Sequence, residues 1–338
     1  MNKLLKVRDL HIYFSTLSQK TWVVRGVNFD LYAKEALGIV GESGCGKSVM
    51  AKSIMRLLPP TSSYAQNGTI LYKNENILSK KEKALCKIRG KEIGMIFQDS
   101  MTSLNPTMKI GHQISEGYTI HYPHISRKQA RLRACGLLER VGISDVQSRM
   151  NQYPHELSGG IRQRVMIAIA MISSPQILIA DEPTTALDVT IQAQILELLK
   201  EVQKKEKMSI IFITHDLSVI ANFCHRVIVM YAGEMIEQAP VHELFQNPKH
   251  PYTCCLLNSI LHLDLPPSQA LYSIHGSPPN LGEKWKGCSF YTRCPHAMKI
   301  CQNMSPKSIK VKDKHHVSCW LFASSIMQKE GNKNATSC

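Results

Sequence analysis

The sequence lacks the features that would place it in a membrane or send it across one. No stretch approaches about 18 consecutive apolar residues, the minimum for a membrane-spanning helix. The first residues, MNKLLK, contain too short an apolar stretch for a secretory signal peptide. We therefore expect a soluble cytoplasmic chain that reaches a membrane only through a partner.

Other absences narrow the function further. The 338 residues contain no internal repeat, no long heptad pattern and no interleaving of aromatic with basic residues, which argues against coiled-coil ATPases and nucleic-acid platforms. The net charge of +15 is scattered, with some concentration after residue 284. We interpret it as a solvated basic face and expect no nucleic-acid partner. The length suits one large α/β core with an appendage.

A glycine-rich segment at residues 41–48 has the spacing G-x-x-x-x-G-K-S of a P-loop. It follows an expected buried strand at 36–40 and precedes an expected helix at 49–55. Such a loop points backbone N–H groups at a polyphosphate, with Lys47 on the β- and γ-phosphates and the Ser48 hydroxyl on Mg²⁺. The expected ATP-binding residues are Gly41, Glu42, Ser43, Gly44, Cys45, Gly46, Lys47, Ser48 and Val49.

Two carboxylates follow a second apolar strand, expected at residues 177–180. We expect Asp181 to hold Mg²⁺ and Glu182 to be the general base for the attacking water. The competing interpretation is the acidic bias of a helix start. It loses weight because Pro183 follows at once and the next helix is expected only from Asp188.

Two more apolar strands end in polar residues. Gln98 closes the strand expected at 93–97, and His215 follows the one expected at 210–214. Either residue alone would be uninformative, and such a histidine is most often a hydrogen-bonded cap. Together with the P-loop and the acidic pair they predict an open α/β sheet with its ligand beyond the carboxyl ends of the strands.

The segment at residues 157–163, LSGGIRQ, completes a set of motifs. Over roughly residues 10–245 the chain resembles the ATPase subunits of ABC transporters. The resemblance implies a RecA-like P-loop ATPase core with an antiparallel β subdomain and a helical signature subdomain. It also implies that ATP is sandwiched between the P-loop of one subunit and the signature of another.

The resemblance assigns roles to individual residues. Gln98 becomes the Q-loop residue, which contacts Mg²⁺ or the attacking water; His215 becomes the switch histidine on the γ-phosphate; and Asp188 lies in the D-loop. Phe14 is our choice to stack on adenine, with Tyr13 and Trp22 as rivals. The signature residues, which contact the ATP of the partner subunit, are Leu157, Ser158, Gly159, Gly160 and Gln163.

The helical subdomain is expected at about residues 99–165. Ser126 is a suitable N-cap for a helix at 127–141. We expect one side of this helix to be apolar, formed by Leu132, Leu137, Leu138 and Val141.

Three segments, at residues 98–111, 153–157 and 250–253, look like those of oligopeptide and dipeptide importer ATPases. This resemblance implies two polytopic permease subunits, a second and related ATPase subunit forming a heterodimer, and an extracytoplasmic peptide-binding protein. The chain would then lie peripherally on the cytoplasmic face of the inner membrane. Import of nickel or an antimicrobial peptide by the same machinery is the main alternative, and a nucleic-acid-dependent ABC ATPase is a more distant one.

The composition shifts toward proline, glycine and cysteine after residue 262, so we divide the chain into an ATPase domain at 1–262 and an extension at 263–338. The extension contains Cys288, Cys294, Cys301 and Cys319. Their spacing, C-x5-C-x6-C-x17-C, leaves zinc, an iron–sulfur cluster and no metal equally open. Resemblance to the C-terminal extension of peptide-importer ATPases favours a [4Fe–4S] cluster, with Zn²⁺ as the alternative.

Overall fold

The structure is a computed structural model. None of the helices in the part that it describes is long and apolar enough to cross a bilayer. The described residues are 2–15, 20–58, 64–99, 103–185, 188–259, 273–283 and 285–323.

The centre of the molecule is an eight-stranded sheet with the strand order β11-β12-β10-β9-β3-β8-β7-β6. Five neighbouring strands run parallel, and every residue of these five is buried. Burial on both faces explains their continuous apolar sequences. The predicted open α/β sheet is confirmed. These strands are β3 (Ala36–Val40), β6 (Ile93–Ile96), β7 (Ile177–Asp181), β8 (Ser209–Thr214) and β9 (Arg226–Tyr231).

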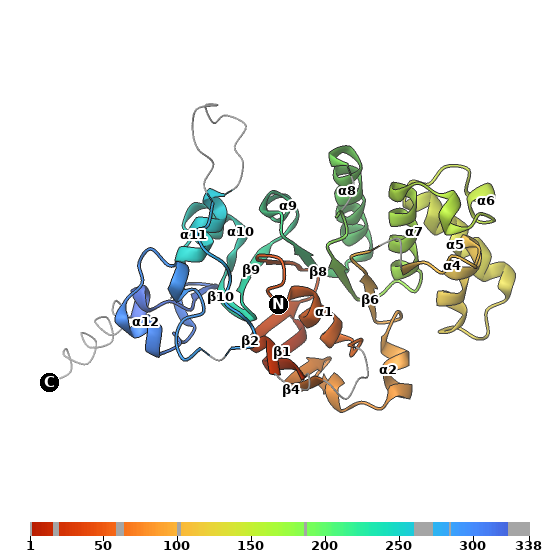
Figure 1. Cartoon of the computed structure of the whole chain (residues 1–338). Helices are drawn as coiled ribbons and strands as arrows, with labels where there is room; N and C mark the ends of the chain where they lie inside the picture. Colours follow the sequence, from red (N-terminus) through yellow and green to blue (C-terminus); the bar gives the residue numbers. More distant parts are fainter. Residues whose placement is uncertain are drawn as a thin grey trace.

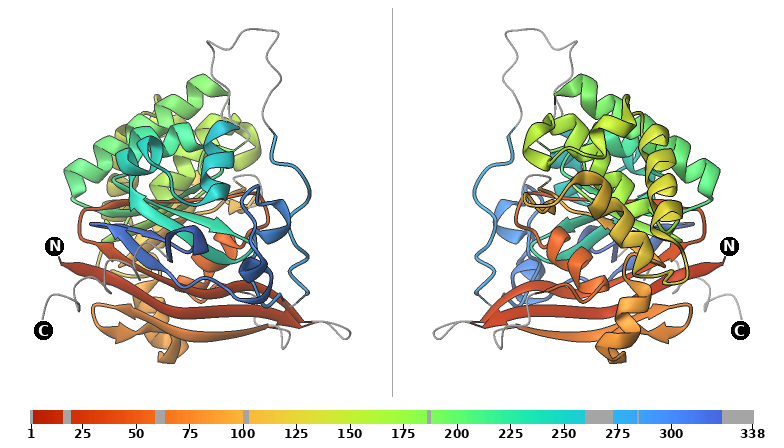
Figure 2. Two further views of the ribbon diagram at one scale, coloured as in Figure 1. Left: turned by 90° about the vertical axis from the view of Figure 1, so that its left-hand side faces the viewer. Right: turned by 90° about the vertical axis from the view of Figure 1, so that its right-hand side faces the viewer.

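A second, antiparallel sheet with the order β2-β1-β4-β5 forms a separate layer, shown in red and orange in Figure 2. Its buried side chains, such as Leu10 and Ile12, share one apolar cluster with Met50 of α1 and with Ile39 and Ile213 of the central sheet. Helix α1 therefore packs in the core that joins the two sheets. The elements are β1 (Lys3–Ser15), β2 (Lys20–Tyr32), β4 (Tyr64–Tyr72), β5 (Glu75–Asn76), α1 (Lys47–Ile54) and α2 (Glu82–Ile88).

Helices α4 to α7 gather at one end of the molecule (Figure 1). Ser126 caps α5 through a capping box with Gln129, as its sequence position suggested. Leu137 and Leu138 are buried, but the expectation for Leu132 was wrong, because this side chain is 62% exposed. Five residues separate Leu132 from Leu137, which places them on different sides of the helix. The helices are α4 (Ile110–Thr119), α5 (Arg127–Arg140), α6 (Val146–Arg149) and α7 (Gly159–Met171).

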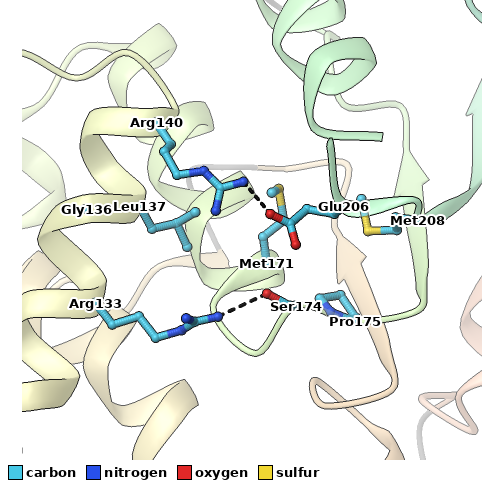
Figure 3. A pocket seen from close by; sticks show the side chains of 9 residues that line it. All are labelled: Arg133, Gly136, Leu137, Arg140, Met171, Ser174, Pro175, Glu206 and Met208. Atoms are coloured by element: carbon cyan, nitrogen blue, oxygen red, sulfur yellow. Dashed lines mark hydrogen bonds and ion pairs between the residues drawn. The ribbon is translucent and has the colours of Figure 1, made fainter. Parts of the chain in front are cut away.

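A cavity of about 240 Å³ lies where α5 faces the core (Figure 3). Arg140 Nη2 lies 2.6 Å from Glu206 Oε1 at the end of α8, and Arg133 Nη2 donates to Ser174 Oγ at 3.0 Å. None of the predicted site residues lines this cavity. Its polar contacts instead tie the helical subdomain to the core. The core helices are α8 (Val189–Glu206), α9 (Leu217–Phe223), α10 (Val241–Gln246) and α11 (Pro251–Asn258).

The extension is joined to the ATPase core through the central sheet itself. β12 pairs antiparallel with β10, and β11 pairs with β12, so both strands prolong the sheet beyond β9. Figure 1 shows this blue region at the end opposite α4–α7. The core strand in this junction is β10 (Glu234–Pro240). The extension contains η3 (Tyr291–Arg293), α12 (Lys299–Asn303), β11 (Ile309–Lys312), β12 (His315–Val317) and η4 (Trp320–Phe322). Two further 3-10 turns, η1 (Ile77–Ser79) and η2 (Pro154–Glu156), lie in the ATPase domain.

A buried carboxylate fastens this junction. Glu237 of β10 has no exposed side-chain surface and accepts from His315 Nε2 of β12 at 2.7 Å. The same carboxylate accepts from the backbone N–H groups of Lys249 and His250 at 2.7 and 2.9 Å. Three donors offset the cost of burying the charge.

We predict that Glu237→Ala lowers the free energy of unfolding by about 3–5 kcal/mol, because three buried donors lose their acceptor. Lys310→Ala is the control. It removes an exposed ion pair with Asp313 and should cost less than about 1 kcal/mol. Urea unfolding of both variants measures the difference, and equal losses would contradict the assignment of Glu237 as the fastening residue.

Candidate active site

The P-loop lies against the backbone of neighbouring strands. Gly46 has φ +99°, and a Cβ atom there would lie 2.3 Å from the carbonyl oxygen of Val23 in β2. A Cβ atom at Gly41 would lie 2.1 Å from the carbonyl oxygen of Met230 in β9. Only glycine allows this close approach, which fixes the path of the loop between β3 and α1.

Lys47 is buried beneath the loop that precedes it, with 4% of its surface exposed. Its ammonium donates to the carbonyl oxygens of Gly41 at 2.8 Å and Glu42 at 2.9 Å. These neutral acceptors are weaker partners than a phosphate oxygen. An anion in the loop can therefore draw the ammonium away from them.

Ser48 and Asp181 bring a hydroxyl and a carboxylate together at the carboxyl edge of the sheet. Ser48 Oγ donates to Asp181 Oδ1 at 2.8 Å. Asp181 Oδ2 is buried and has no hydrogen-bond partner among the described residues. Burial raises the pKa of Asp181, against the opposing effect of the Ser48 hydrogen bond. Mg²⁺ prefers oxygen ligands. A buried carboxylate oxygen that accepts no hydrogen bond, beside a hydroxyl oxygen, therefore fits this ion.

The two other polar strand ends, Gln98 and His215, meet at Glu182. Gln98 Nε2 donates to Glu182 Oε2 at 3.1 Å, and His215 Nδ1 lies 3.5 Å from Glu182 Oε1. Thr185 Oγ1 also donates to Glu182 Oε2, at 2.9 Å. Glu182 has φ +48°, a conformation that is uncommon for residues other than glycine. The structure thus holds this carboxylate in a fixed place within reach of two polar side chains from different strands.

The signature segment leads into α7. Ser158 is exposed at the N-cap, where the helix start favours an anion. Leu157 is buried, and a Cβ atom at Gly160 would lie 3.1 Å from Ile191 of α8. Gln163, expected to contact the ATP of the partner subunit, is 4% exposed and donates to the Pro183 carbonyl at 2.6 Å. It thereby braces α7 against the segment that carries Glu182.

Two remaining candidates lie beside this edge. Asp188 caps α8 by accepting from the Ile191 N–H at 2.9 Å, while Ala186 and Leu187 of the D-loop fall outside the described residues. Phe14 packs on the apolar cluster that contains Cys45 of the P-loop. The rings of its rivals Tyr13 and Trp22 pack on one another, with centroids 4.7 Å apart.

The four late cysteines were predicted to hold a metal centre. Among the described residues, no group of three or more His, Cys, Asp or Glu side chains could hold a metal ion. Burial raises the pKa of Cys288 to about 12 and that of Cys319 to about 11, and it also raises the pKa of Cys294.

Two contacts of the site were not predicted from the sequence. Thr185 orients Glu182, and the Tyr252 hydroxyl accepts from the backbone N–H of Glu42 in the P-loop at 3.0 Å. Thr185 follows the acidic pair so closely that its position was a usable signal. Tyr252 lies in the segment at 250–253, which sequence likeness marked without giving it a role.

Comparison with known proteins agrees with this geometry. Residues 24–185 match the family model for the ABC transporter, and residues 236–301 match that for the oligopeptide/dipeptide transporter, C-terminal region. The oligopeptide transport ATP-binding protein OppD of Bacillus subtilis is 52% identical over 322 residues, covering 95% of this chain and 90% of the relative. The chain belongs to this family of transporter ATP-binding subunits.

Other relatives and solved structures extend the comparison. The dipeptide transport ATP-binding protein DppD of Bacillus subtilis is 51% identical and covers 95% of both chains. The solved dimeric structure of MJ0796, a bacterial ABC transporter cassette, is 29% identical with a TM-score of 0.63 and covers 70% of this chain and 98% of that one. This chain therefore has the predicted fold, with a RecA-like P-loop ATPase core.

We predict that Asp181→Asn raises the melting temperature of the nucleotide-free chain at pH 7 while abolishing Mg²⁺-dependent ATP hydrolysis. Because the folded-state pKa of Asp181 is raised, its ionised form costs stability at neutral pH. As the pH falls toward 3.8, the ordinary pKa of an aspartate side chain, Asp181 becomes protonated in the folded chain and this cost disappears.

Differential scanning calorimetry across this pH range, with the exposed Asp313→Asn as control, measures the effect. A melting temperature for Asp181→Asn that stays below that of the wild type at pH 7 would contradict it.

Proposed function

We propose that this chain is the ATP-hydrolysing subunit that energises import of dipeptides and oligopeptides by an ABC transporter. The observation that carries the proposal is the convergence of Gln98 and His215 on the Glu182 carboxylate, beside the Ser48–Asp181 pair. Membership of the peptide-transporter family supplies the class of cargo.

Each residue then has a part in hydrolysis. Glu182 accepts the proton of the attacking water, while Gln98 and Thr185 hold its carboxylate in orientation. His215 and Lys47 bind the γ-phosphate. When bound by Ser48, Gln98 and Asp181, Mg²⁺ supplies positive charge to the phosphate oxygens. Phe14 stacks on the adenine ring.

A second subunit completes each site. We assign Ser158 and Gly160 to the ATP bound by the partner subunit, since Ser158 is exposed at the start of α7. Gln163 supports that contact from within the chain through Pro183. The partner is a second and related ATPase subunit, so the working unit is a heterodimer.

The membrane partners would bind beside the Q-loop. Asn105 forms an Asx turn by accepting from Thr107, and Gln113 of α4 donates to the Asn105 carbonyl at 3.0 Å, which makes this loop rigid. Next to it, a cavity of about 580 Å³ is lined by α4, α5 and neighbouring residues. We assign this region to two polytopic permease subunits, which would place the chain at the cytoplasmic face of the membrane and in indirect contact with a peptide-binding protein.

The extension at 263–338 is proposed to hold a [4Fe–4S] cluster on Cys288, Cys294, Cys301 and Cys319. Two observations support it. The Cys288 N–H donates to the Cys301 carbonyl at 2.7 Å, and the backbone at Phe290, His296 and Leu321 hydrogen-bonds to the sulfur two residues earlier. Backbone donors at the sulfur stabilise the thiolates that such a cluster needs.

For the proposed function we predict that Glu182→Gln retains MgATP binding, loses ATP turnover by about 10²–10⁴-fold and traps the closed dimer. In vesicles reconstituted with permease and partner subunits, it should also abolish peptide uptake. Glu197→Gln, an exposed change on α8, is the control. If Glu182→Gln hydrolysed ATP near the wild-type rate, Glu182 would not be the base. If the wild-type transporter took up nickel and not peptide, the assignment of the cargo would be wrong.

For the cysteines we predict that the chain purified without oxygen contains iron and labile sulfide, and that Cys301→Ser removes both. Metal analysis and the visible absorption spectrum measure this. Cys86→Ser, an exposed cysteine outside the extension, is the matched control. Zinc without iron would favour the alternative ion, and absence of both would leave the extension as a purely structural unit.

A further inference from the structure

A bidentate ion pair that the proposed mechanism does not use joins the extension to the P-loop. Arg293 of η3 makes a bidentate ion pair with Glu42, with Nη1–Oε2 at 2.9 Å and Nη2–Oε1 at 3.0 Å. The two residues are 251 positions apart. The Arg293 side chain is 5% exposed and the Glu42 side chain 23%, so the pair is only partly screened by solvent.

Every N–H donor of this guanidinium is used. Besides the two bonds to Glu42, Arg293 donates to the Tyr231 hydroxyl at 3.1 Å and to the carbonyls of His275 at 3.0 Å and Ile274 at 3.3 Å. Burial alone would lower the pKa of Arg293, but the bonds to Glu42 and Tyr231 raise it above its ordinary value. A lysine has three donors and no planar fork, so it cannot replace this set.

Glu42 is also fixed through its backbone. Its N–H donates to Tyr252, whose buried ring packs on Tyr231 and on Phe290 of the extension, with centroids 4.7 and 5.4 Å away. Phe290 lies three residues before Arg293 and is completely buried. The extension therefore reaches both the side chain and the backbone of one P-loop residue.

The position of Glu42 matters because its carbonyl is one of the two carbonyl groups that accept from Lys47. A shift at Glu42 moves the backbone that surrounds the phosphate-binding lysine. We propose that Arg293 is a positioning residue for ATP binding: acting through Glu42, it keeps the P-loop in the conformation that receives nucleotide. The extension is thereby part of the nucleotide site. This inference rests on nucleotide binding at the P-loop and not on the nature of the cargo.

The test is equilibrium binding of MgADP to the full-length chain by calorimetry, together with steady-state ATPase kinetics. If loss of the pair leaves about a tenth of the P-loops competent, Arg293→Ala weakens MgADP binding and raises KM about tenfold, with kcat little changed. Arg293→Lys should be similarly impaired, because one charge does not rebuild the fork. Glu42→Gln should give the same loss, and the double variant should be no worse than either single one.

Lys312→Ala is the matched control, because Lys312 pairs with Glu243 of α10 and so joins the extension to the core without contacting the P-loop. It should bind MgADP as the wild type does. Unchanged affinity in Arg293→Ala, or a double variant whose losses add, would overturn the inference. If Arg293→Ala fails to fold, Glu42→Gln decides, since it leaves the guanidinium and its other bonds in place.

The same binding experiment distinguishes an error in the proposed function from an error in this inference. Lys47→Ala should abolish MgADP binding, and a wild-type chain that binds no MgADP would contradict the nucleotide site itself. A wild type that binds, with Arg293 and Glu42 variants that bind equally well, would contradict only the positioning role.

Discussion

The active site depends on one geometric constraint, that the parallel strands β3, β6, β7 and β8 end at the same edge of one sheet. Each strand contributes a polar group just where its apolar residues end, so the P-loop, Gln98, Asp181 and His215 meet without any long-range signal in the sequence. Burial of the strands on both faces makes their ends rigid. The left-handed conformation of Glu182 is tolerated because this framework determines it on every side.

The same constraint explains what the sequence could predict. A short apolar run followed by a polar residue is a local pattern, and local patterns give strands, strand ends and helix caps, as at Ser126 and Asp188. Where the pattern was weaker, the prediction was worse. Leu132 was assigned to the apolar side of α5, although its spacing from Leu137 puts it on another side.

The sequence could not predict the contacts between residues that lie far apart along the chain. Glu237 with His315 and Glu42 with Arg293 join residues far apart in sequence, and no sequence motif links the two members of either pair. Both pairs bind the extension to the ATPase core, one along the sheet and the other at the P-loop. The composition shift after residue 262 suggested a separate appendage, whereas β11 and β12 continue the central sheet.

The account is tested most directly by a structure of the Glu182→Gln chain with MgATP bound. We predict that Lys47 leaves the carbonyls of Gly41 and Glu42 for the phosphates, and that Ser48 and Asp181 hold Mg²⁺. Arg293 should remain paired with Glu42. Nucleotide bound elsewhere, or a Lys47 that keeps its present partners with MgATP in the loop, would contradict the account.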